Sequence, residues 1–497
     1  MGNKFYITTA IAYTNAGPHI GHALEFIQAD VVVRYHRLLG EETFFLTGTD
    51  EHGTKIARAA AAAGEKEQDF VDRIAVQFVK LDKDLNISND GFIRTTDKER
   101  HWPAVVKLWK KLEEKRDLYK KTYKGLYCSG CEAFLRKSEV VDGRCVIHKT
   151  EPDKVSEENW FFKLPKYKKE IKNKIESGEL KIVPEIRKKE ILNLLDDAED
   201  VSFSRPSKDL RWGIPVPGDD NQTMYVWADA LTNYISAIGY EQETEQFKKF
   251  WPADVHLIGK DILRFHALYW PAMLMAIGLE LPKAIYVHGF ITVDGEKMSK
   301  SIGNVVDPFA LINKYGAEVA RYFLIREIPS GEDGNFSYAK LEERYNGDLA
   351  NGLGNLVQRI ITLIESKING ELIFKKELLE KEVEARVAEL FKKYRESIDN
   401  FQLHEALGNV WELVSLGDKY MDDKKPWVAI KHDEAEFLKI MTNLVSVLYN
   451  VAWMLLPFMP ETADKIFEAL SADKKAGTLE NYKFKIKKSE GLFPRIK

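Results

Sequence analysis

Short apolar runs alternate with amphipathic segments over the first 118 residues of the chain. The runs FYITTA (5–10) and ETFFLTG (42–48) are rich in β-branched and aromatic residues, which predicts two buried strands. Elsewhere in this stretch apolar residues recur at helical spacing, and we predict helices over residues 20–40, 54–64, 66–84 and 101–118. Strands that alternate with helices usually pair in parallel, so this pattern predicts an α/β fold with a parallel sheet.

The alternation stops at about residue 119 and returns further along the chain. Residues 119–210 are rich in Lys and Glu, which predicts an insertion between two halves of the sheet. Strand-like segments return at MYVWADA (224–230), DVHLIGK (254–260) and KAIYVHGFITV (283–293), and we expect them to complete the sheet. Amphipathic helices then fill residues 346–475, and no strand pattern appears before the last dozen or so residues.

Composition indicates a globular chain of several domains. A length of 497 residues favours two to four domains, and 44% hydrophobic with 30% charged residues is not typical of a disordered protein. The formal net charge of −4 is unlike that of a nucleic-acid binder, so a polyanionic partner would be held by local patches. Lys-rich segments that suit either such a patch or a solvated helix face lie at 110–124, 166–174 and 483–488.

One segment is long and apolar enough to cross a bilayer, namely the uncharged stretch 440–460. It contains Asn443, Ser446 and Asn450, and prolines stand at 457 and 460, so we predict a buried helix of a bundle instead. The N-terminus lacks the apolar region of a signal peptide. We therefore expect a cytoplasmic protein that does not enter a membrane.

All three cysteines of the chain fall within a short segment that also contains a histidine. Cys128 and Cys131 form a C-x2-C pair, and after thirteen intervening residues Cys145 and His148 form a C-x2-H pair. Three thiolates and one imidazole supply the four ligands of a tetrahedral zinc ion, with no position left for water. The spacing predicts one closed structural zinc site. A disulfide is disfavoured because the cysteine count is odd.

The segment PHIGH follows the first predicted strand and opens the first predicted helix. Pro18 suits the first turn of a helix. His19 and His22 would lie at the helix start, where backbone N–H groups favour anions, and Gly21 would let a phosphate or a base approach the backbone. The residues alone leave two alternatives open: two histidines that merely cap a helix, and an H-x-x-H zinc site.

A second candidate site follows the strand-like segment 283–293. The segment DGEKMSKSIGN, residues 294–304, places Lys297 and Lys300 in a Gly-flanked loop. Such a loop is often an ordinary exposed turn. Two ammonium groups on it could also close over a triphosphate and neutralise the charge that builds as pyrophosphate leaves.

PHIGH and KMSKS, in this order and on these elements, resemble the two signatures of class I aminoacyl-tRNA synthetases. Within that class the chain resembles the methionyl-tRNA synthetase family over essentially its whole length. The segments that carry this resemblance are AIAYTNAGPHIGH, GTDEHGTKI, the CxxC/CxxH segment, YVWADALTNYI, HLIGKDILRFHALYWPAML, VHGFITVDGEKMSKS, NGDLANGLGNLVQR and KKPWVAI.

The resemblance implies an α/β fold in which a Rossmann-like parallel-sheet catalytic domain is split by a zinc-knuckle insertion. An all-α helical-bundle anticodon-binding domain would follow it. The boundaries that we expect are 1–118 for the first half of the catalytic domain, 119–210 for the insertion with its knuckle at 124–150, 211–295 for the second half, 296–345 for the KMSKS loop and stem-contact region, and 346–497 for the anticodon-binding domain.

The resemblance also assigns roles to particular residues. His19, His22, Lys297 and Lys300 would be catalytic, and ATP would be bound by His19, Gly21, His22, Lys260, Asp261, Lys297 and Lys300. Methionine would be bound by Ile11, Tyr13, Asp50, Trp227, Ala230, Leu231, Tyr234, Ile262 and His266, with Asp50 on the α-ammonium group. The anticodon would be read by Asn351, Asn355, Arg359 and Trp427. For several pocket residues and for Trp427, plain core packing is the alternative.

The implied reaction joins L-methionine to tRNA(Met) at the expense of ATP, which brings Mg²⁺ with it. The chain has one knuckle and lacks the C-terminal tRNA-binding domain of some relatives, so we expect a one-zinc monomer. The alternatives are a synthetase for valine, leucine, isoleucine or cysteine, a small nucleotidyltransferase, and a tRNA-binding module without activity. An insertion of about 90 residues is short for the editing domain that the first three synthetases usually carry.

Overall fold

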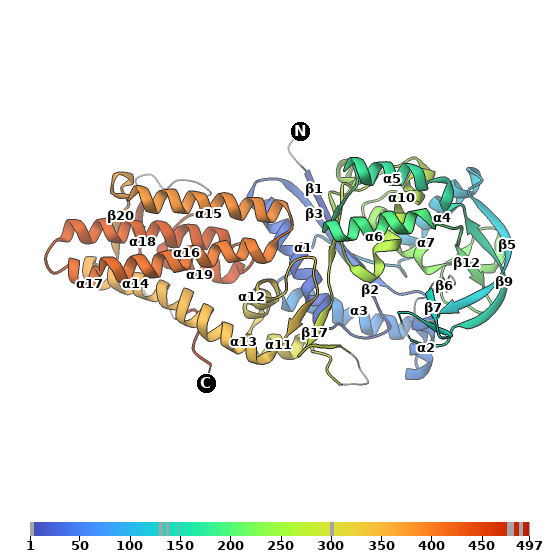
Figure 1. Ribbon diagram of the computed structural model, residues 1–497, viewed down its shortest axis with the longest axis horizontal. Coiled ribbons are helices and arrows are strands. Elements are labelled where there is room, and N and C mark those ends of the chain that lie inside the picture. The colour runs from blue at the N-terminus through green and yellow to red at the C-terminus, as the bar shows by residue number, and fades with distance from the viewer. Residues whose placement is uncertain are drawn as a thin grey trace. The chain divides into compact units, whose positions relative to one another are not determined.

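The computed structural model describes residues 4–128, 133–135, 139–147, 149–298, 303–474, 482–486 and 491–496. The chain forms two compact units, shown as ribbons in Figure 1. The first unit comprises Met1–Pro18, Glu41–Lys83 and Ile87–His288, and the second comprises His19–Gly40, Asp84–Asn86 and Gly289–Lys497. The helix that follows the first strand thus belongs to the second unit, although the sequence places it within an expected domain of residues 1–118.

The first unit is built on a parallel sheet of seven strands among the described residues. β1 lies in its interior and pairs in parallel with β3 on one side and with β15 on the other. The carboxyl ends of these three strands therefore meet at one edge, where the strand order reverses and ligands usually bind. The strands are β1 (Lys4–Thr9), β2 (Ala12–Tyr13), β3 (Glu42–Asp50), β4 (Gly91–Arg94), β10 (Lys181–Val183), β15 (Val255–Gly259) and β16 (Ala284–His288).

The predicted strands 5–10, 42–48 and 254–260 are confirmed as β1, β3 and β15, but two other strand predictions need correction. The strand predicted over 224–230 is wrong, because β14 ends at Met224 and a helix, α7 (Val226–Ala230), follows. This short helix is buried almost all round, so its apolar run lacks helical periodicity. The strand predicted over 283–293 is two strands, β16 and β17 (Ile291–Val293), which belong to different sheets.

Helices cover one face of the parallel sheet through a large apolar core. Tyr6, Leu46 and Ile258 of the sheet share this core with Trp109 and Trp270 of the helices above it. α4 packs against α8 and α10, and α5 packs against α6 and α10. The helices of the first unit are α2 (Thr54–Ala63), α3 (Glu67–Asp84), α4 (His101–Glu114), α5 (Lys168–Ser177), α6 (Glu185–Asp196), α7, α8 (Asn233–Ser236), α9 (Glu245–Phe250) and α10 (Trp270–Ile277).

The predicted insertion of residues 119–210 contains a four-stranded antiparallel sheet, whose two long strands β5 and β9 are visible in Figure 1. The insertion also contains β10, which pairs in parallel with β16 and so extends the main sheet. Three residues are too few to reveal this strand in the sequence. The further strands of the first unit are β5 (Leu118–Cys128), β6 (Ala133–Leu135), β7 (Val140–Val141), β8 (Arg144–Cys145), β9 (Asp153–Phe162), β11 (Val201–Ser202), β12 (Ser204–Pro206), β13 (Pro215–Val216) and β14 (Asp219–Met224).

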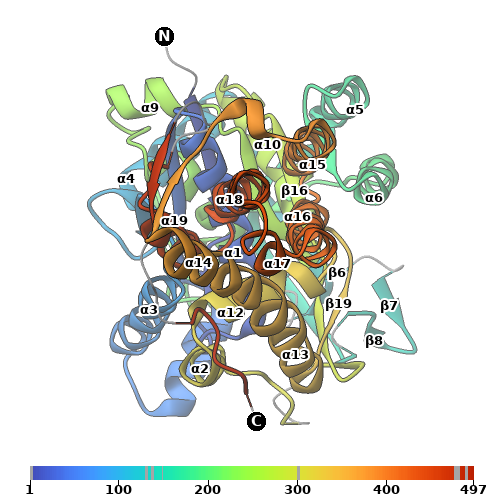
Figure 2. The same ribbon diagram turned by 90° about the vertical axis from the view of Figure 1, so that its left-hand side faces the viewer.

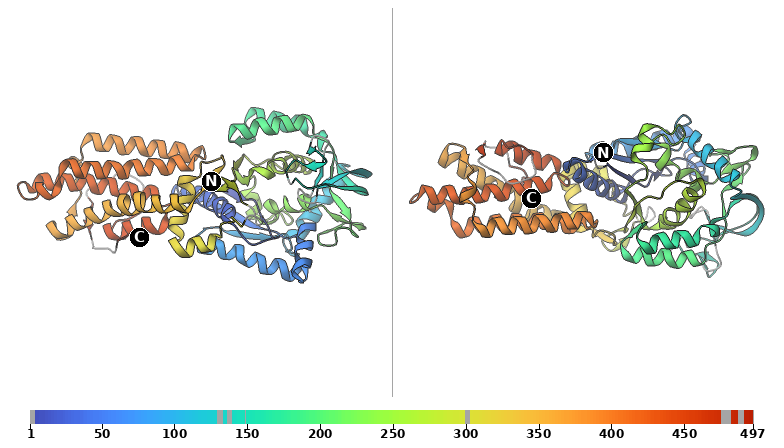
Figure 3. Two further views of the ribbon diagram at one scale, coloured as in Figure 1. Left: turned by 60° about the horizontal axis from the view of Figure 1, so that its bottom comes forward. Right: turned by 90° about the horizontal axis from the view of Figure 1, so that it is seen from above.

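The second unit is mainly helical, as predicted for residues 346–475. α15, α16, α18 and α19 pack in succession, and Figure 2 shows several of these helices nearly end-on. They run side by side, in orange and red, in both views of Figure 3. The helices are α1 (Ile20–Leu38), α11 (Pro308–Tyr315), α12 (Ala317–Glu327), α13 (Tyr338–Arg344), α14 (Asn355–Ile368), α15 (Lys381–Asp399), α16 (Leu403–Lys424), α17 (Pro426–Ala429), α18 (Glu434–Leu455) and α19 (Pro460–Leu470).

Two small sheets complete the second unit. β17, β18 (Glu296–Lys297) and β19 (Gly334–Phe336) form one of them. β20 (Glu371–Ile373) pairs antiparallel with β21 (Lys483–Lys485), although the helices α15 to α19 separate the two strands in the chain. The expected all-α domain thus also contains a pair of short strands, of which the sequence pattern did not predict β20. A π-helix, η5 (Tyr345–Gly354), leads directly into α14.

The apolar segment 440–460 is a buried helix of the bundle, as predicted. α18 is long and apolar enough to span a membrane by composition, but 78% of its most apolar window is buried inside the protein. It packs against α15, α16 and α19. Its hydrophobicity is therefore that of a core helix.

A fully buried arginine ties α1 to the bundle. Arg321 of α12 forms an ion pair with Asp30 of α1 at 2.7 Å. The Nε and Nη2 atoms of Arg321 also donate to the carbonyl oxygens of Phe458 and Pro457 at 2.8 and 2.9 Å. A buried charge is tolerated only when it is paired and hydrogen-bonded in this way, which explains why α1 groups with the second unit.

Candidate active site

His19 and His22 cap α1 reciprocally. The Nδ1 atom of His19 accepts a hydrogen bond from the backbone N–H of Gly21, and the Nδ1 atom of His22 accepts one from the backbone N–H of His19, both at 3.1 Å. The two rings stack with their centroids 3.9 Å apart. This arrangement is a capping box made by two imidazoles, so both histidines do cap the helix.

The cap also fixes what the two histidines can offer to a ligand. Because each Nδ1 atom accepts a hydrogen bond, each neutral ring carries its proton on Nε2, which is then a donor. Gly21 is required for this geometry, since a Cβ atom there would lie 2.9 Å from Cε1 of His19. The space above Gly21 is thus used by the ring of His19, where the sequence suggested a base or a phosphate. The Nε2–H groups of both rings suit an anion such as a phosphate.

The KMSKS segment begins on the second strand of a hairpin in the second unit. Lys297 ends β18, and its backbone oxygen accepts a hydrogen bond from Asn304 Nδ2 at 3.2 Å. The hairpin turns at Asp294 and Gly295, both of which have positive φ. Lys300 lies outside the described residues. The backbone N–H of Ile20 donates to the carbonyl oxygen of Val306 at 3.3 Å, so the chain just after this loop contacts the first turn of α1.

Several predicted ligand-binding residues of the first unit lie together at the carboxyl edge of the parallel sheet. Ile11 and Tyr13 follow β1, and Asp50 is the last residue of β3, where Tyr13 is its strand partner. Lys260 and Asp261 directly follow β15. Asp50 is 8% exposed, whereas Asp261 is exposed. The strand order of the sheet thus gathers residues that are up to 250 positions apart in sequence.

The predicted side-chain pocket is an aromatic cluster beside this edge. The ring of Trp227 stacks on Phe265 with centroids 3.6 Å apart and meets His266 edge-on at 6.4 Å. Tyr234 and Leu231 are almost fully buried in the same apolar cluster, whereas the predicted residues Ile11, Trp227 and Ile262 pack against it and stay partly exposed. Ala230, in α7, is buried as well. The predicted set therefore has a deeply buried part and a partly exposed part, which consists of Ile11, Trp227 and Ile262.

His266 is held in one orientation and one protonation state. Its Nε2 atom accepts from the hydroxyl group of Tyr234 at 2.7 Å, and its Nδ1–H group donates to the carbonyl oxygen of Ile262 at 3.0 Å. Burial lowers the pKa of His266 to about 4, against the smaller raising effect of the hydrogen bond to Ile262. His266 lies in a short π-helix, η4 (Phe265–Tyr269), a conformation that often occurs at functional sites. A neutral imidazole suits an uncharged side chain such as that of methionine.

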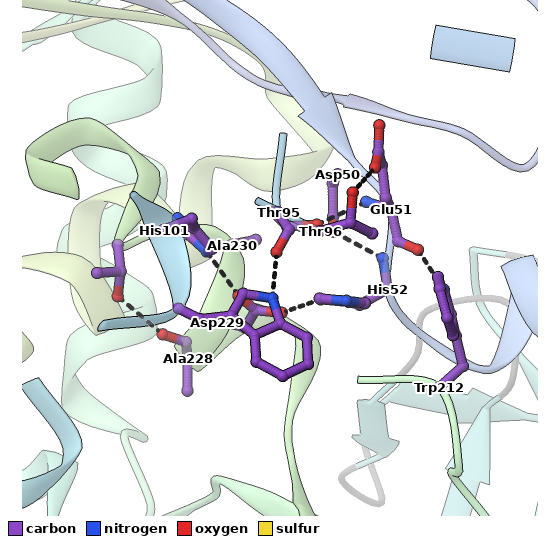
Figure 4. A network of polar contacts seen from close by, with 12 residues as sticks. Asp50, Glu51, His52, Thr95, Thr96, His101, Trp212, Ala228, Asp229 and Ala230 are labelled. Carbon is purple, nitrogen blue, oxygen red and sulfur yellow. Dashed lines mark hydrogen bonds and ion pairs between the residues drawn. The ribbon is translucent and has the colours of Figure 1, made fainter. Parts of the chain in front are cut away.

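A buried polar network, drawn in Figure 4, supports the end of β3. Asp229 of α7 accepts hydrogen bonds from His52 Nδ1 at 2.6 Å and from His101 Nε2 at 2.7 Å. Glu51 is fully buried and accepts from Arg94 Nε at 2.6 Å. Sequence reasoning missed Asp229, His52 and His101. The sequence did contain a cue for His52, which stands two residues after Asp50. Asp229 was missed because its segment was predicted wrongly as a strand.

The predicted anticodon residues lie on the helices of the second unit. The guanidinium carbon of Arg359 lies 5.5 Å from the ring centroid of Trp427, and Arg359 Nη2 donates to Asp422 at 2.7 Å. Trp427 is 38% exposed, so the alternative of a core tryptophan is wrong. Asn355 and Arg359 share a face of α14, but Asn351 lies in the π-helix η5, so its predicted α-helical spacing to them does not hold. Asn351 and Asn355 are exposed.

Two of the four predicted zinc ligands can be placed. Cys128 and Cys145 are both buried, and they pack in one small cluster with Leu135. Cys128 of β5 is the strand partner of Ala133 of β6. The backbone N–H of Cys145 donates to the carbonyl oxygen of Thr150, and the carbonyl oxygen of Cys145 accepts from the backbone N–H of Lys149. Cys131 and His148 lie outside the described residues. Among the residues that are described, no cluster of three or more His, Cys, Asp and Glu could hold a metal ion.

Three features define a class I tRNA synthetase: the parallel sheet with reversed strand order at its carboxyl edge, the capping histidines, and the helical second unit. Comparisons with known families agree: the family described as tRNA synthetases class I (M) matches residues 5–145 and 135–361. The anticodon-binding domain of tRNA ligases matches residues 380–492.

Individual relatives show which family of class I tRNA synthetases this is. The methionine–tRNA ligase of Thermotoga maritima is 44% identical over 489 residues, covering 96% of this chain and 77% of that protein. The methionine–tRNA ligase of Brucella suis is 42% identical, covering 95% and 93%. Mycobacterium tuberculosis methionyl-tRNA synthetase in complex with methionyl-adenylate superposes with a TM-score of 0.94 at 39% identity, covering 99% of this chain and 100% of that one. The chain belongs to the methionyl-tRNA synthetase family, and the predicted family is confirmed.

The low pKa of His266 predicts a pH dependence of stability. The ordinary histidine pKa is about 6.5, so the unfolded chain binds a proton at this residue that the folded chain, with a pKa of about 4, does not. The contribution of neutral His266 to the free energy of unfolding is therefore complete above pH 6.5 and is lost as the pH falls towards 4. Between pH 7 and pH 5 the free energy of unfolding should fall by about 2 kcal/mol more in the native chain than in His266→Gln.

Urea unfolding of both proteins at the two pH values measures this difference. An equal loss of stability in both proteins would show that His266 titrates normally in the folded state.

Proposed function

We propose that this chain joins methionine to tRNA in the two steps of its family, and that the predicted site residues carry the chemistry. The observation that carries the proposal is the arrangement at the carboxyl edge of the sheet. A buried carboxylate, Asp50, lies there beside an aromatic cluster that contains His266, whose imidazole is neutral. A carboxylate binds the α-ammonium group of an amino acid, and an aromatic pocket with a neutral imidazole suits a thioether.

In the first step an oxygen of the methionine carboxylate attacks the α-phosphorus of ATP. The bond from that phosphorus to the oxygen that bridges the β-phosphate breaks, and pyrophosphate leaves with the electron pair. No protein residue forms a covalent bond, so catalysis consists of positioning and charge stabilisation. His19 and His22 would donate their Nε2–H groups to the phosphates, with Lys297 and Lys300 as further donors. Lys260 and Asp261 would bind the nucleoside part, and Mg²⁺ would accompany ATP.

In the second step a hydroxyl group of the terminal adenosine of tRNA attacks the carbonyl carbon of methionyl-adenylate. The bond from that carbon to the phosphate oxygen breaks, AMP leaves with the electron pair, and the hydroxyl proton passes to the departing phosphate or to water. Selection of tRNA(Met) would rest on the helices of the second unit. Asn351, Asn355 and Arg359 would hydrogen-bond to unstacked anticodon bases, and the exposed ring of Trp427 would stack on one of them. Arg359 already covers one face of that ring, which leaves the other for a base.

We propose further that Cys128, Cys131, Cys145 and His148 bind one structural zinc ion. The fit of the two described cysteines supports this, because both are buried and pack in one small cluster. A zinc ion supplies four bonds that a small segment needs to fold, and with all ligands from the protein it does no chemistry. The monomeric state and the cytoplasmic location stay predictions.

Amino-acid-dependent exchange of pyrophosphate into ATP tests the function. Methionine should support exchange, whereas valine, leucine, isoleucine and cysteine should support it at least about 100-fold less well, because a pocket shaped for the thioether rejects shorter and branched side chains. Exchange that depends equally on another amino acid would contradict the proposal, as would no exchange at all.

The variant Asp50→Ala should lose methionine-dependent exchange, because the α-ammonium group loses its counter-charge. Asp69→Ala provides the matched control, since Asp69 is an exposed carboxylate on α3 of the same unit.

Removal of the exposed ring of Trp427 should separate the two steps. In Trp427→Ala the kcat/KM for charging of tRNA should fall about 10- to 100-fold, because stacking of one base is worth on the order of 1–3 kcal/mol. Methionine-dependent pyrophosphate exchange should not change, since no tRNA is needed for it. The control is Val428→Ala, the next residue of α17 and equally exposed. A Trp427→Ala protein that lost both activities alike would point to a structural role.

Metal analysis tests the zinc proposal. The purified chain should contain one zinc per molecule, and Cys145→Ser should retain less than about a tenth of it, because loss of one thiolate greatly weakens binding. Val146→Ser, which changes the exposed neighbouring residue, should keep its zinc. Zinc retained in full by Cys145→Ser, or absent from the native chain grown with zinc, would overturn the assignment.

A further inference from the structure

Asp229 is a buried carboxylate that connects three separate parts of the first unit. It lies in α7 and is only 1% exposed. Its Oδ2 atom accepts from Nδ1 of His52, just after β3, and its Oδ1 atom accepts from Nε2 of His101, the first residue of α4. Figure 4 shows the Asp229 side chain between the two imidazoles. Both oxygens therefore hold a partner, and so little of the side chain is exposed that Asp229 acts through these partners.

The chemistry of this cluster makes the connection rigid. An ionised carboxylate only accepts hydrogen bonds, so His52 must carry a proton on Nδ1 and His101 must carry one on Nε2. Burial by itself would raise the pKa of Asp229, but its interactions with His52 and His101 outweigh burial, and the pKa lies below its ordinary value. On its other side, Nδ1 of His101 lies 2.9 Å from the hydroxyl of Ser236. The carboxylate thus stays charged and keeps both partners.

The two ends of this connection lead to the two halves of the proposed methionine site. His52 stands two residues after Asp50, and its backbone N–H group points to Oδ1 of Asp50 at 3.4 Å. Asp229 stands in the same short helix as Trp227 and Ala230, which belong to the proposed wall of the side-chain pocket. The carboxylate of Asp229 is therefore a cross-link between the group that would hold the α-ammonium and the wall that would hold the thioether.

We propose that Asp229 is a positioning residue that sets the distance between Asp50 and the pocket wall, and thereby the length of side chain that the site accepts. The inference rests on the proposed function, because it assumes the methionine site described above. A fixed distance between the two anchors selects an amino acid of one length. An analogue that is longer by one methylene, such as ethionine, is rejected to the extent that this distance cannot change.

The variant Asp229→Asn removes the charge at nearly constant size. The amide has only one acceptor oxygen, so one of the two histidines loses its partner and the end of β3 is no longer tied to α7. We expect the Kd for methionine without ATP, measured by calorimetry, to rise about tenfold. In pyrophosphate exchange the KM for ATP should stay within about twofold, and the ratio of kcat/KM for methionine over ethionine should fall about tenfold.

Asp117→Asn is the matched control, because Asp117 is also 1% exposed and accepts from two partners, Lys166 at 2.6 Å and Tyr167 at 2.5 Å. It should lower stability without changing the methionine Kd or the ethionine ratio. If Asp229→Asn does not fold, His52→Ala and His52→Asn replace it, since an asparagine amide can place an N–H donor near the position of Nδ1. His52→Asn should then bind methionine nearly as the native chain does, and His52→Ala about tenfold more weakly.

An unchanged methionine Kd and an unchanged ethionine ratio in folded Asp229→Asn would overturn the inference, as would equal losses in His52→Ala and His52→Asn. A native chain that binds methionine but does not exchange pyrophosphate would overturn the proposed function alone. The loss of methionine binding in Asp229→Asn would in that case still support the role of Asp229.

Discussion

The parallel pairing of β1 with two strands from distant parts of the chain is the constraint on which the candidate active site depends. Ile7 pairs with Phe45 of β3 on one side and with Val255 of β15 on the other. Because all three strands point in the same direction, their carboxyl ends meet at one edge, and the reversal of strand order leaves room there for a ligand. Asp50 and Asp261 reach this edge only through that pairing.

Hydrogen bonds within the protein hold the capping histidines and the polar network around Asp229 in place before any ligand binds. His19 and His22 bind backbone N–H groups with one nitrogen each, which determines the donor that the other nitrogen presents. Asp229 accepts from two imidazoles in the core. Burying such groups is costly unless each one is paired, and the pairing makes their positions definite. A site that relies on positioning, without covalent catalysis, needs such rigidity.

Two π-helical segments carry residues with proposed roles in binding. η4 contains His266, and η5 contains Asn351. In both cases the π-helix runs directly into an α-helix, α10 or α14. The extra residue in a π-helical turn changes the direction of the side chains relative to the following helix. This is why the spacing of Asn351, Asn355 and Arg359, which looks regular in sequence, does not place all three on one α-helical face.

The sequence by itself determined the alternating α/β pattern, the helical second part, the buried nature of α18 and the two signature segments, because these features repeat locally or consist of rare residues at fixed spacing. It could not show that β10 joins the main sheet, that α1 groups with the second unit, or that residues 226–230 form a helix. Those outcomes depend on pairing and burial between segments far apart in the chain. The hydrogen bonds of Asp229 to His52 and His101 are another outcome that the sequence could not show. Only the tertiary structure brings a carboxylate and its partners together when nearly 180 residues separate them.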